Sequence, residues 1–469
     1  MSETTFDLIV IGGGPAGYVG AIRAAQLGMN VACIDKRATL GGTCLNVGCI
    51  PSKALLNASE KYADAISGHL AGLGVTFSKV GLDLDAMMSA KDSVVTSLTD
   101  GIDFLFRKNK ITRLTGTASI AEAGKVNITD GPDKGSYHAD RIMIATGSEP
   151  ASLPNIDIDE KKIVSSTGAL SLSKLPKKMV VIGAGYIGLE MGTVWSRLGT
   201  EVEVVEFLPR ILPGMDSEVA AKFKAMLAKQ GLAFHLNTAV KSAKAGKSGV
   251  TLAVEDNTSC ELRDIKCDIA LVAVGRTPNS QNLGLEALGV ELTAKGQIVV
   301  DADFETNIEG IFAVGDVIEG PMLAHKAEED AVAAVEIMAG QAGHVDYDLV
   351  PGIVYTAPEI ATLGATEDRL KEQNIAYHKG VFPFLANSRA KATGHTDGFV
   401  KILADSKTDK VLGCHIIGHE AGTLIHEIAT AMAFGASSED IARTCHGHPT
   451  MNEAVKEAAL AVDGRAIHI

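Results

Sequence analysis

Residues 7–35 read DLIVIGGGPAGYVGAIRAAQLGMNVACID, and this stretch decides how the N-terminal part of the chain folds. A short apolar run of the kind buried in parallel sheets leads into Gly12, Gly14 and Gly17, and a second apolar run ends in Asp35. The glycines let the backbone turn tightly and approach a pyrophosphate at a helix N-terminus, and the acid can accept a hydrogen bond from a ribose hydroxyl. The stretch therefore predicts a strand–helix–strand unit that binds a dinucleotide.

The same arrangement occurs a second time further along the chain. An apolar run leads into Gly183, Gly185 and Gly188, and the next apolar run ends in Glu206. Glu206 lies 23 residues after the first of these glycines, which is the spacing found in the first unit. In step with this repeat, DRIMIATGSEP at 140–150 matches DIALVAVGRTP at 268–278. The chain is therefore expected to be a duplication that binds two dinucleotides.

A pair of cysteines lies in the stretch GGTCLNVGCIPSK, residues 41–53. In a regular helix Cys44 and Cys49 would be separated by a rise of about 7.5 Å, whereas a disulfide tolerates at most ~7 Å between Cα atoms. The pair can bond only if the turn is irregular, which Gly48 and Pro51 permit. We interpret it as a redox disulfide at a helix start, where the dipole favours a thiolate. Two buried free cysteines are the alternative that the spacing leaves open.

A disulfide close to one of two dinucleotide sites indicates a two-electron relay. Thiols and nicotinamide exchange electrons poorly without a mediator, and a flavin can serve as that mediator. Because Cys44 follows Asp35 closely in the sequence, the first unit is expected to hold FAD and the second a nicotinamide dinucleotide. Glu206 would repel a ribose phosphate, so NAD is expected rather than NADP.

Beyond the second unit, Asp316 ends another buried apolar run, where it either contacts a cofactor hydroxyl or caps the next helix. From about Asp346 the sequence changes to an α+β pattern without a nucleotide fingerprint. Strands are expected at Tyr355–Pro358, Ala361–Gly364, Phe399–Ala404 and Val411–Ile417, and helices are expected after the last of them.

The C-terminal region carries a second polar cluster, CHGHPT at 445–450, followed by Glu453. Thiol–disulfide exchange needs a group that accepts and returns protons, and a histidine held by a carboxylate fits this role. His448 with Glu453 is the expected pair, and His446 is the alternative base. A metal site built from Cys445 and the two histidines would lack a fourth ligand nearby, so no resident metal is expected.

Composition excludes several classes of protein. The formal net charge of −14 argues against nucleic acid and anionic membranes as partners. No apolar run approaches the ~20 residues of a membrane span, and a strand is expected from Phe6, which leaves no room for a signal or transit peptide. Seven cysteines in 469 residues do not form a structural disulfide framework. The expected location is the cytoplasm, or the mitochondrial matrix if a presequence was removed.

Together these motifs resemble the pyridine nucleotide–disulfide oxidoreductases over essentially the whole chain. GPAGYVGAI at 14–22 and the ending GRAIHI resemble the branch that acts on lipoamide rather than the one that acts on glutathione. The resemblance implies an α/β fold with two Rossmann-like dinucleotide-binding domains and a C-terminal α+β dimerisation domain. The implied divisions are an FAD-binding domain at 1–148, an NAD-binding domain at 149–275, a central domain completing the FAD site at 276–345 and an interface domain at 346–469.

The implied activity is the oxidation, by NAD⁺, of dihydrolipoamide carried on the lipoyl domains of multienzyme complexes. The implied assembly is a homodimer. Cys44 would exchange with the substrate, Cys49 would face the flavin, and His448, held by Glu453, would act from the opposite subunit. FAD contacts are implied at Gly12, Gly14, Gly17, Asp35, Lys36, Thr43, Lys53, Gly116, Thr146, Gly147, Ser148, Asp316, Met322, Leu323, Ala324 and His325. NAD contacts are implied at Gly183, Gly185, Gly188, Glu190, Glu206, Val240 and Gly275.

Two other functions stay open at this point. One is the reduction of another disulfide, as in the glutathione branch, and the other is a flavin-binding scaffold subunit whose catalysis is incidental. Mercuric and large thioredoxin reductases are disfavoured because they carry a further reactive pair at the C-terminus, and no cysteine follows Cys445. Lys53 and Glu190 match a pair near the flavin and the nicotinamide. Whether Tyr186 gates the nicotinamide pocket is left undecided by the sequence.

Overall fold

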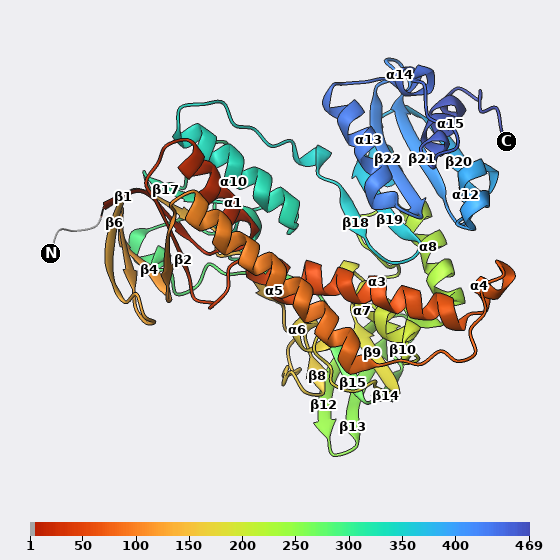
Figure 1. The fold of residues 1–469 in the computed structure, drawn as a ribbon, viewed down its shortest axis with the longest axis horizontal. Coiled ribbons are helices and arrows are strands. Elements are labelled where there is room, and N and C mark those ends of the chain that lie inside the picture. The colour runs from red at the N-terminus through yellow and green to blue at the C-terminus, as the bar shows by residue number, and fades with distance from the viewer. Residues whose placement is uncertain (1–4) are drawn as a thin grey trace. The chain divides into compact units, whose positions relative to one another are not determined.

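The computed structural model describes residues 5–469, which form two compact units (Figure 1). The first unit contains the described residues up to Leu55 together with Asp85–Ala151 and Gly275–Tyr347. The second contains Leu56–Leu84, Ser152–Val274 and Asp348–Ile469. Each unit therefore joins segments that are far apart in the sequence. The division into four domains expected from the sequence stays a prediction.

The core of the first unit is a parallel sheet in the order β3-β2-β1-β6-β17. Along β1, residues 8–11 are buried on both faces, as expected for a strand covered by helices on both sides. The first half of β6 pairs instead with an antiparallel meander of β4 and β5. The strands of this sheet are β1 (Thr5–Ile11), β2 (Val31–Asp35), β3 (Thr112–Thr115), β4 (Ala118–Glu122), β5 (Lys125–Ile128), β6 (Gly135–Ile144) and β17 (Ile311–Ala313).

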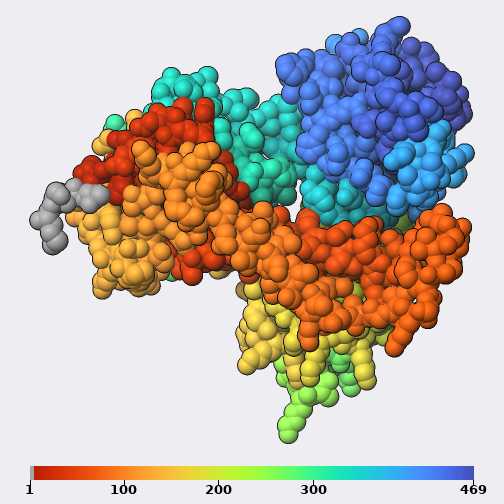
Figure 2. Space-filling view, in the orientation of Figure 1, coloured from red at the N-terminus to blue at the C-terminus, as the bar shows by residue number. Residues whose placement is uncertain are grey.

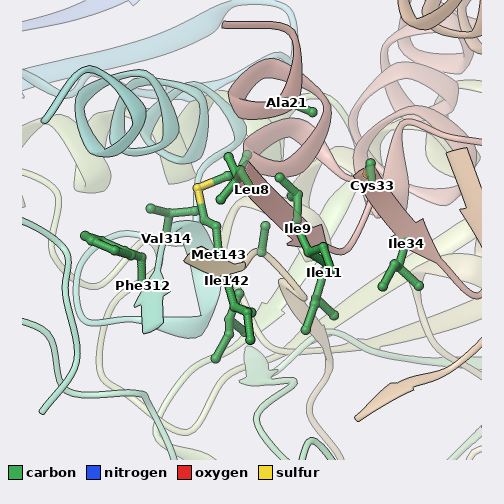
Figure 3. Packing of buried hydrophobic residues seen from close by; sticks show 14 of the residues in the cluster. Leu8, Ile9, Ile11, Ala21, Cys33, Ile34, Ile142, Met143, Phe312 and Val314 are labelled. Carbon is green, nitrogen blue, oxygen red and sulfur yellow. The ribbon is translucent and has the colours of Figure 1, made fainter. Parts of the chain in front are cut away.

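Helices α1 (Pro15–Gln26) and α10 (Ala324–Met338) pack against each other and against the sheet. A Cβ on Gly20 would lie 2.6 Å from Met143 Cε and 3.2 Å from Ala331 Cβ, so glycine at this position permits the close packing. Figure 3 shows Leu8 and Met143 side by side in this apolar cluster. The tight packing fixes the N-termini of both helices relative to the strands.

The fingerprint glycines are required by the backbone. Gly12 has φ +107°, and a Cβ there would lie 2.3 Å from the Ala145 carbonyl oxygen. A Cβ on Gly17 would lie 1.7 Å from the Gly12 carbonyl oxygen, so only glycine lets the helix start this close to the strand. In the second unit, Gly183 with φ +103° and Gly188 meet the same two obstacles.

The second unit repeats the parallel sheet in the order β11-β10-β9-β15-β8, with α7 (Tyr186–Arg197) following β9. An antiparallel meander accompanies it, and Figure 2 shows the tip of the β12–β13 hairpin projecting at the bottom of the view. The expected duplication and α/β fold class are confirmed. The strands are β8 (Ile163–Val164), β9 (Lys178–Ile182), β10 (Glu201–Val205), β11 (Leu232–His235), β12 (Thr238–Gly246), β13 (Gly249–Asp256), β14 (Leu262–Cys267) and β15 (Ile269–Val272).

The segments that follow the two repeated strands pair with each other. β7 (Ser148–Pro150) and β16 (Arg276–Pro278) form an antiparallel ribbon within the first unit, with Ser148 opposite Pro278 and Pro150 opposite Arg276. Equivalent positions of the duplication have thus become hydrogen-bonding partners.

The C-terminal part of the second unit is an antiparallel sheet in the order β18-β19-β22-β21-β20. Helix α13 (Ala421–Ala433) packs on β19 and β22, and α15 (Glu453–Val462) packs on β20 and β21. The expected α+β fold is confirmed. The strands are β18 (Gly352–Val354), β19 (Glu359–Gly364), β20 (Tyr377–Pro383), β21 (Phe399–Asp405) and β22 (Val411–Gly418).

The strand expected at Tyr355–Pro358 is wrong. These residues form the turn between β18 and β19, with a cis peptide bond before Pro358. The strand lies just before them, at Gly352–Val354, and proline cannot donate to a ladder. β20 was not expected from the sequence.

The other helices connect these sheets, and no helix within residues 5–469 is long and apolar enough to cross a membrane. They are α2 (Gly42–Val47), α3 (Cys49–Ile66), α4 (His69–Gly72), α5 (Leu84–Lys108), α6 (Ser166–Ala169), α8 (Ser217–Lys229), α9 (Leu285–Leu288), α11 (Glu367–Glu372), α12 (Ser388–Thr393), α14 (Ser438–Arg443) and the 3₁₀ turns η1 (Gly315–Val317), η2 (Tyr347–Leu349) and η3 (Phe384–Ala386).

A buried lysine ties the nucleotide-binding part of the second unit to its C-terminal sheet. Lys401 on β21 is fully buried, and its Nζ lies 2.9 Å from Asp216, 3.1 Å from Glu218 and 2.6 Å from Glu367. Burial raises the pKa of the Glu367 carboxyl, but hydrogen bonds from Lys401, Lys371 and Tyr377 outweigh it and hold that pKa well below its ordinary value. The ammonium therefore compensates several carboxylates at once.

We expect Lys401→Met to lower the free energy of unfolding by about 3–5 kcal/mol at neutral pH, because it leaves buried carboxylates uncompensated. The lowered pKa of Glu367 means that its stabilisation is present above the ordinary value of 4.5 and is lost as the pH falls through the folded value. The difference from wild type should therefore shrink below about pH 4.

Urea denaturation of wild type and variant at neutral pH and below about pH 4 measures this difference in the free energy of unfolding. The matched control is Lys371→Met, which removes an exposed partner of the same Glu367 and should cost less than about 1 kcal/mol. Equal losses for the two variants would contradict the role given to burial.

Candidate active site

Cys44 and Cys49 lie on either side of a break between two helices. α2 ends at Gly48, whose φ of −141° and ψ of −115° are not helical, and α3 begins at the next residue. A Cβ on Gly48 would lie 2.8 Å from the Thr43 carbonyl oxygen and 3.3 Å from Cys44 Cα. Glycine therefore lets the chain fold back closely enough for the two sulfur atoms to meet. The irregular turn expected between the cysteines is confirmed.

Cys44 and Cys49 are both partly buried. The hydrogen bond to Cys49, burial, and the negative charges of Cys49 and Glu328 raise the pKa of the Cys44 thiol, and Lys53 opposes this.

The residues expected to contact FAD lie in the first unit, mostly along one edge of its sheet. The fingerprint glycines follow β1, Asp35 ends β2, Gly116 follows β3, and Asp316 follows β17. Thr146, Gly147 and Ser148 follow β6, Thr43 and Lys53 lie on α2 and α3, and Lys36 follows Asp35. Met322 to His325 lead into and begin α10. The carboxyl ends of parallel strands are where α/β sheets bind nucleotides, so the structure brings these residues to one place.

The two fingerprint acids make the same hydrogen bonds. Asp35 accepts from the Gly13 N–H at 2.6 Å and from the Arg37 N–H at 2.7 Å. Glu206 accepts from the Ala184 N–H at 2.7 Å and from the Leu208 N–H at 2.9 Å. Each carboxylate thus holds its glycine turn in shape. Each oxygen has two lone pairs, so a ribose hydroxyl can still be accepted.

The first unit fits FAD. The N-cap of α1 is Gly14, which makes no side-chain cap, and a Cβ on it would meet only Gly42 Cα at 3.7 Å. Helix N–H groups that point into backbone-lined space favour a pyrophosphate. The second unit fits NAD in the same way, because a Cβ on Gly185, the N-cap of α7, would meet no atom within 4 Å.

Asp316 takes part in a charged network rather than capping the next helix. Its Oδ2 accepts a hydrogen bond from Ser148 Oγ at 2.5 Å, and Arg276 Nε donates to the same hydroxyl at 2.6 Å. Burial lowers the pKa of the Arg276 guanidinium, whereas Asp316 raises it. Arg276 is not among the site residues predicted from the sequence. The one sequence feature that distinguishes Arg276 is that it replaces Ser148, the residue at the equivalent position of the first repeat.

Most residues expected to contact NAD lie in the second unit. The glycines form the β9–α7 turn, Glu206 follows β10 and Val240 lies on β12. Glu190 on α7 is buried and accepts a hydrogen bond from the Tyr355 N–H at 3.1 Å. Gly275 belongs to the first unit, as does Lys53, so their expected roles beside the nicotinamide stay predictions.

The two C-terminal histidines differ in their surroundings. His448 is mostly exposed and its Nδ1 lies 2.9 Å from Glu453 Oε1. His446 is buried, with Nε2 2.6 Å from Glu427 and Nδ1 2.9 Å from the Thr444 carbonyl oxygen. Both ring nitrogens of His446 are therefore engaged, whereas His448 presents Nε2 to solvent. This difference supports His448 as the acid–base group.

Glu453 is suited to orient His448. Burial raises the pKa of the Glu453 carboxyl, but hydrogen bonds from the Thr450 N–H and from His448 outweigh it and hold that pKa below its ordinary value. Within residues 5–469, no group of three or more His, Cys, Asp or Glu side chains is arranged to hold a metal ion.

Known proteins of similar sequence and structure agree with this geometry. Residues 6–331 match the family model described as pyridine nucleotide-disulphide oxidoreductase, and residues 350–459 match its dimerisation domain. The chain is 54% identical over 464 residues to a mitochondrial dihydrolipoyl dehydrogenase from Pisum sativum, covering 99% of this chain and 92% of the relative. It is 56% identical over 460 residues to leghemoglobin reductase from Glycine max, covering 97% and 87%. The HOCl-induced flavoprotein disulfide reductase RclA from Escherichia coli superposes with a TM-score of 0.85 at 26% identity, covering 96% and 98%.

Two nucleotide-binding sheets and a dithiol at a helix start define a nucleotide-dependent disulfide oxidoreductase. The family match assigns the class more narrowly. The chain belongs to the pyridine nucleotide–disulphide oxidoreductase family. The expected use of FAD and NAD is thereby confirmed.

We expect Gly48→Ala to impair formation of the Cys44–Cys49 disulfide, because the added Cβ meets backbone atoms that cannot move independently of α2. After mild oxidation, thiol titration of the Gly48→Ala variant should find more than one additional reactive thiol per chain compared with wild type. Gly101→Ala on α5 is the matched control, since a Cβ there meets no atom within 4 Å. A Gly48→Ala variant that oxidises as completely as the control would show that the close approach is not needed.

Proposed function

We propose that this chain oxidises dihydrolipoamide carried on lipoyl domains and reduces NAD⁺, through the Cys44–Cys49 pair and the His448–Glu453 pair. The observation that carries the proposal is the helix break at Gly48, where the chain folds back so closely that a Cβ would lie 3.3 Å from Cys44 Cα, immediately before Cys49. The relative from Pisum sativum, which is named a dihydrolipoyl dehydrogenase and is similar over nearly its whole length, supports the substrate.

The thiol chemistry follows from the properties of the two cysteines. A substrate thiolate attacks the Cys44 sulfur of the oxidised pair, which forms a mixed disulfide and releases Cys49 as a thiolate. The second substrate thiolate then attacks its own mixed disulfide, which closes lipoamide and releases Cys44. Two electrons have moved to the cysteine pair, and the raised pKa of Cys44 lets that residue take up a proton on release.

His448 is proposed to move the protons. Each attack requires a thiolate, so a base must remove the proton of the substrate thiol. The His448 side chain is mostly exposed, and its Nδ1 is held by Glu453, which fixes the orientation of the ring. In the proposed homodimer, His448 serves the dithiol of the other subunit. The match of residues 350–459 to a dimerisation domain supports this assembly.

The cofactors are held by residues of the chain that have no part in thiol exchange. FAD, when bound, supplies a two-electron acceptor between the dithiol and NAD. Gly14 and Asp35 would hold its diphosphate and ribose, and Asp316 would accept from one of its hydroxyls. Glu206 would accept from the NAD ribose and would repel the additional phosphate of NADP.

The alternatives are separated by substrate. The relative from Glycine max is named a leghemoglobin reductase, and a scaffold subunit would have no activity of its own. Turnover of free dihydrolipoamide by the isolated protein favours the proposed activity over both. The compartment we propose is the cytoplasm or the mitochondrial matrix, and the mitochondrial relative supports the second.

We expect Cys44→Ser and Cys49→Ser each to abolish NAD⁺ reduction by dihydrolipoamide, because neither variant can form the Cys44–Cys49 disulfide that accepts the electrons. NADH formation at 340 nm measures this, with bound flavin absorbance confirming that the site is loaded. Cys260→Ser is the control, since Cys260 lies on an exposed turn and should leave the rate unchanged. Full activity in either active-site variant would refute the relay.

We expect His448→Gln to lower the rate of dihydrolipoamide oxidation by about 10²- to 10⁴-fold, the usual effect of losing an acid–base group. His446→Gln should have a smaller effect on the rate and a larger one on thermal stability, because His446 is buried between Glu427 and the Thr444 carbonyl. Steady-state kinetics and thermal unfolding of both variants test the assignment. If His446→Gln is the slower enzyme, the base has been assigned to the wrong histidine.

A further inference from the structure

A fully buried ion pair underlies the turn that carries Asp316. The side chains of Lys326 and Asp330, one helical turn apart on α10, are both 0% exposed, and Lys326 Nζ lies 2.7 Å from Asp330 Oδ2. The proposed thiol exchange does not use this pair, and the stability of the fold does not explain why two charged side chains are buried here. An ammonium in the first turn of a helix opposes the helix dipole, and buried ion pairs often stabilise less than apolar side chains of similar size.

The pair holds both polar groups of Gly315, the residue before Asp316. The Gly315 N–H donates to Asp330 Oδ2 at 3.0 Å, and Lys326 Nζ donates to the Gly315 carbonyl oxygen at 3.1 Å. Lys326 also donates to the Glu319 carbonyl oxygen at 3.4 Å. The backbone at 315–319 is therefore wrapped around one ammonium group, and its shape is set by that group.

The surroundings leave this loop little freedom. Gly315 has φ +77°, and a Cβ there would lie 3.1 Å from Ala327 Cβ on α10. A Cβ on Gly320 would lie 3.0 Å from Lys326 Cε and 3.2 Å from the Tyr347 ring. The Tyr347 hydroxyl donates to Asp330 Oδ1 at 3.0 Å. The ion pair is thus enclosed by the loop on one side and by Tyr347 on the other.

We propose that the Lys326–Asp330 pair is a positioning device for FAD, which fixes the 315–320 loop so that the Asp316 carboxylate stands ready for a cofactor hydroxyl. This inference rests on the proposed function, because it concerns the same FAD site. Asp316 is held at its carboxylate by Ser148, and the ion pair fixes its backbone. Both constraints come from side chains of the protein itself, so they would lower the cost of ordering the loop when FAD binds.

The test compares FAD affinity with stability of the protein. Lys326→Met combined with Asp330→Leu replaces the ion pair by apolar groups and leaves no buried charge. The variant leaves the buried Gly315 N–H and carbonyl oxygen without these partners, so the unfolding midpoint of the apoprotein should fall, and the titration is run at a temperature at which the variant is folded. The dissociation constant for FAD, measured by titrating full-length apoprotein into free flavin and following the fluorescence, should rise by about 10- to 100-fold.

The matched control is the pair Arg23–Glu336, which joins the same helices α1 and α10 at 2.6 Å but is partly exposed. Arg23→Met combined with Glu336→Leu should leave the FAD dissociation constant unchanged. The inference is overturned if the folded buried-pair variant binds FAD as tightly as wild type, or if the control variant loses as much FAD affinity as the buried-pair variant.

A single substitution covers the case in which the double variant does not fold. Tyr347→Phe removes one hydrogen bond to Asp330 from a partly exposed ring and buries no charge. It should raise the FAD dissociation constant by about two- to tenfold, and an unchanged constant would overturn the inference. Wild-type apoprotein that binds no FAD would instead refute the proposed function.

Discussion

The hydrogen bond from the Gly13 N–H to the Asp35 carboxylate is the contact on which the first unit depends. At 2.6 Å it joins the turn after β1 to the end of β2, so helix α1 starts at a fixed place beside the strand edge. The second unit uses the same bond, from Ala184 to Glu206. A short, charge-assisted bond of this kind is directional, and it leaves the helix N–H groups pointing away from the protein. The shape of each glycine turn is therefore held by hydrogen bonds within the protein.

The duplication kept this bond and changed what surrounds it. Four strands have the same order in both sheets, whereas the fifth strand comes from the end of the first unit's chain segments (β17) but from before the repeat in the second (β8). An antiparallel meander accompanies each sheet. The segments that leave the sheets have diverged, and they now pair as β7 and β16. Ser148 and Arg276 occupy equivalent positions of the repeat, yet the guanidinium donates to the hydroxyl of its counterpart. One copy thus completes the site of the other.

The sequence predicts those parts of the structure that local sterics impose. Gly12 and Gly17 are irreplaceable because a carbonyl oxygen occupies the place of a Cβ, and Gly48 marks the helix break for the same reason. Contacts between distant residues could not be predicted in this way. Arg276 and Ser148 are far apart in the chain, and the Lys326–Asp330 pair looks like any exposed pair at helical spacing until the 315–320 loop covers it. The residue types at Tyr355–Pro358 predict a strand because tyrosine and threonine favour strands, but Pro358 cannot donate to a ladder, and the segment is the connection between β18 and β19.

The hydrogen bonds that Glu206 makes to the backbone constrain how cofactor preference can evolve. Its two oxygens accept hydrogen bonds from the N–H groups of Ala184 and Leu208, so the side chain that we propose as a ribose ligand also holds the backbone in place. Reversing its charge would attract an additional phosphate and at once leave two backbone donors without their acceptor. A lineage that changes from one pyridine nucleotide to the other must first acquire a substitute brace elsewhere in the turn. Preference for the unphosphorylated coenzyme is in this sense locked in by the architecture and not only by the pocket.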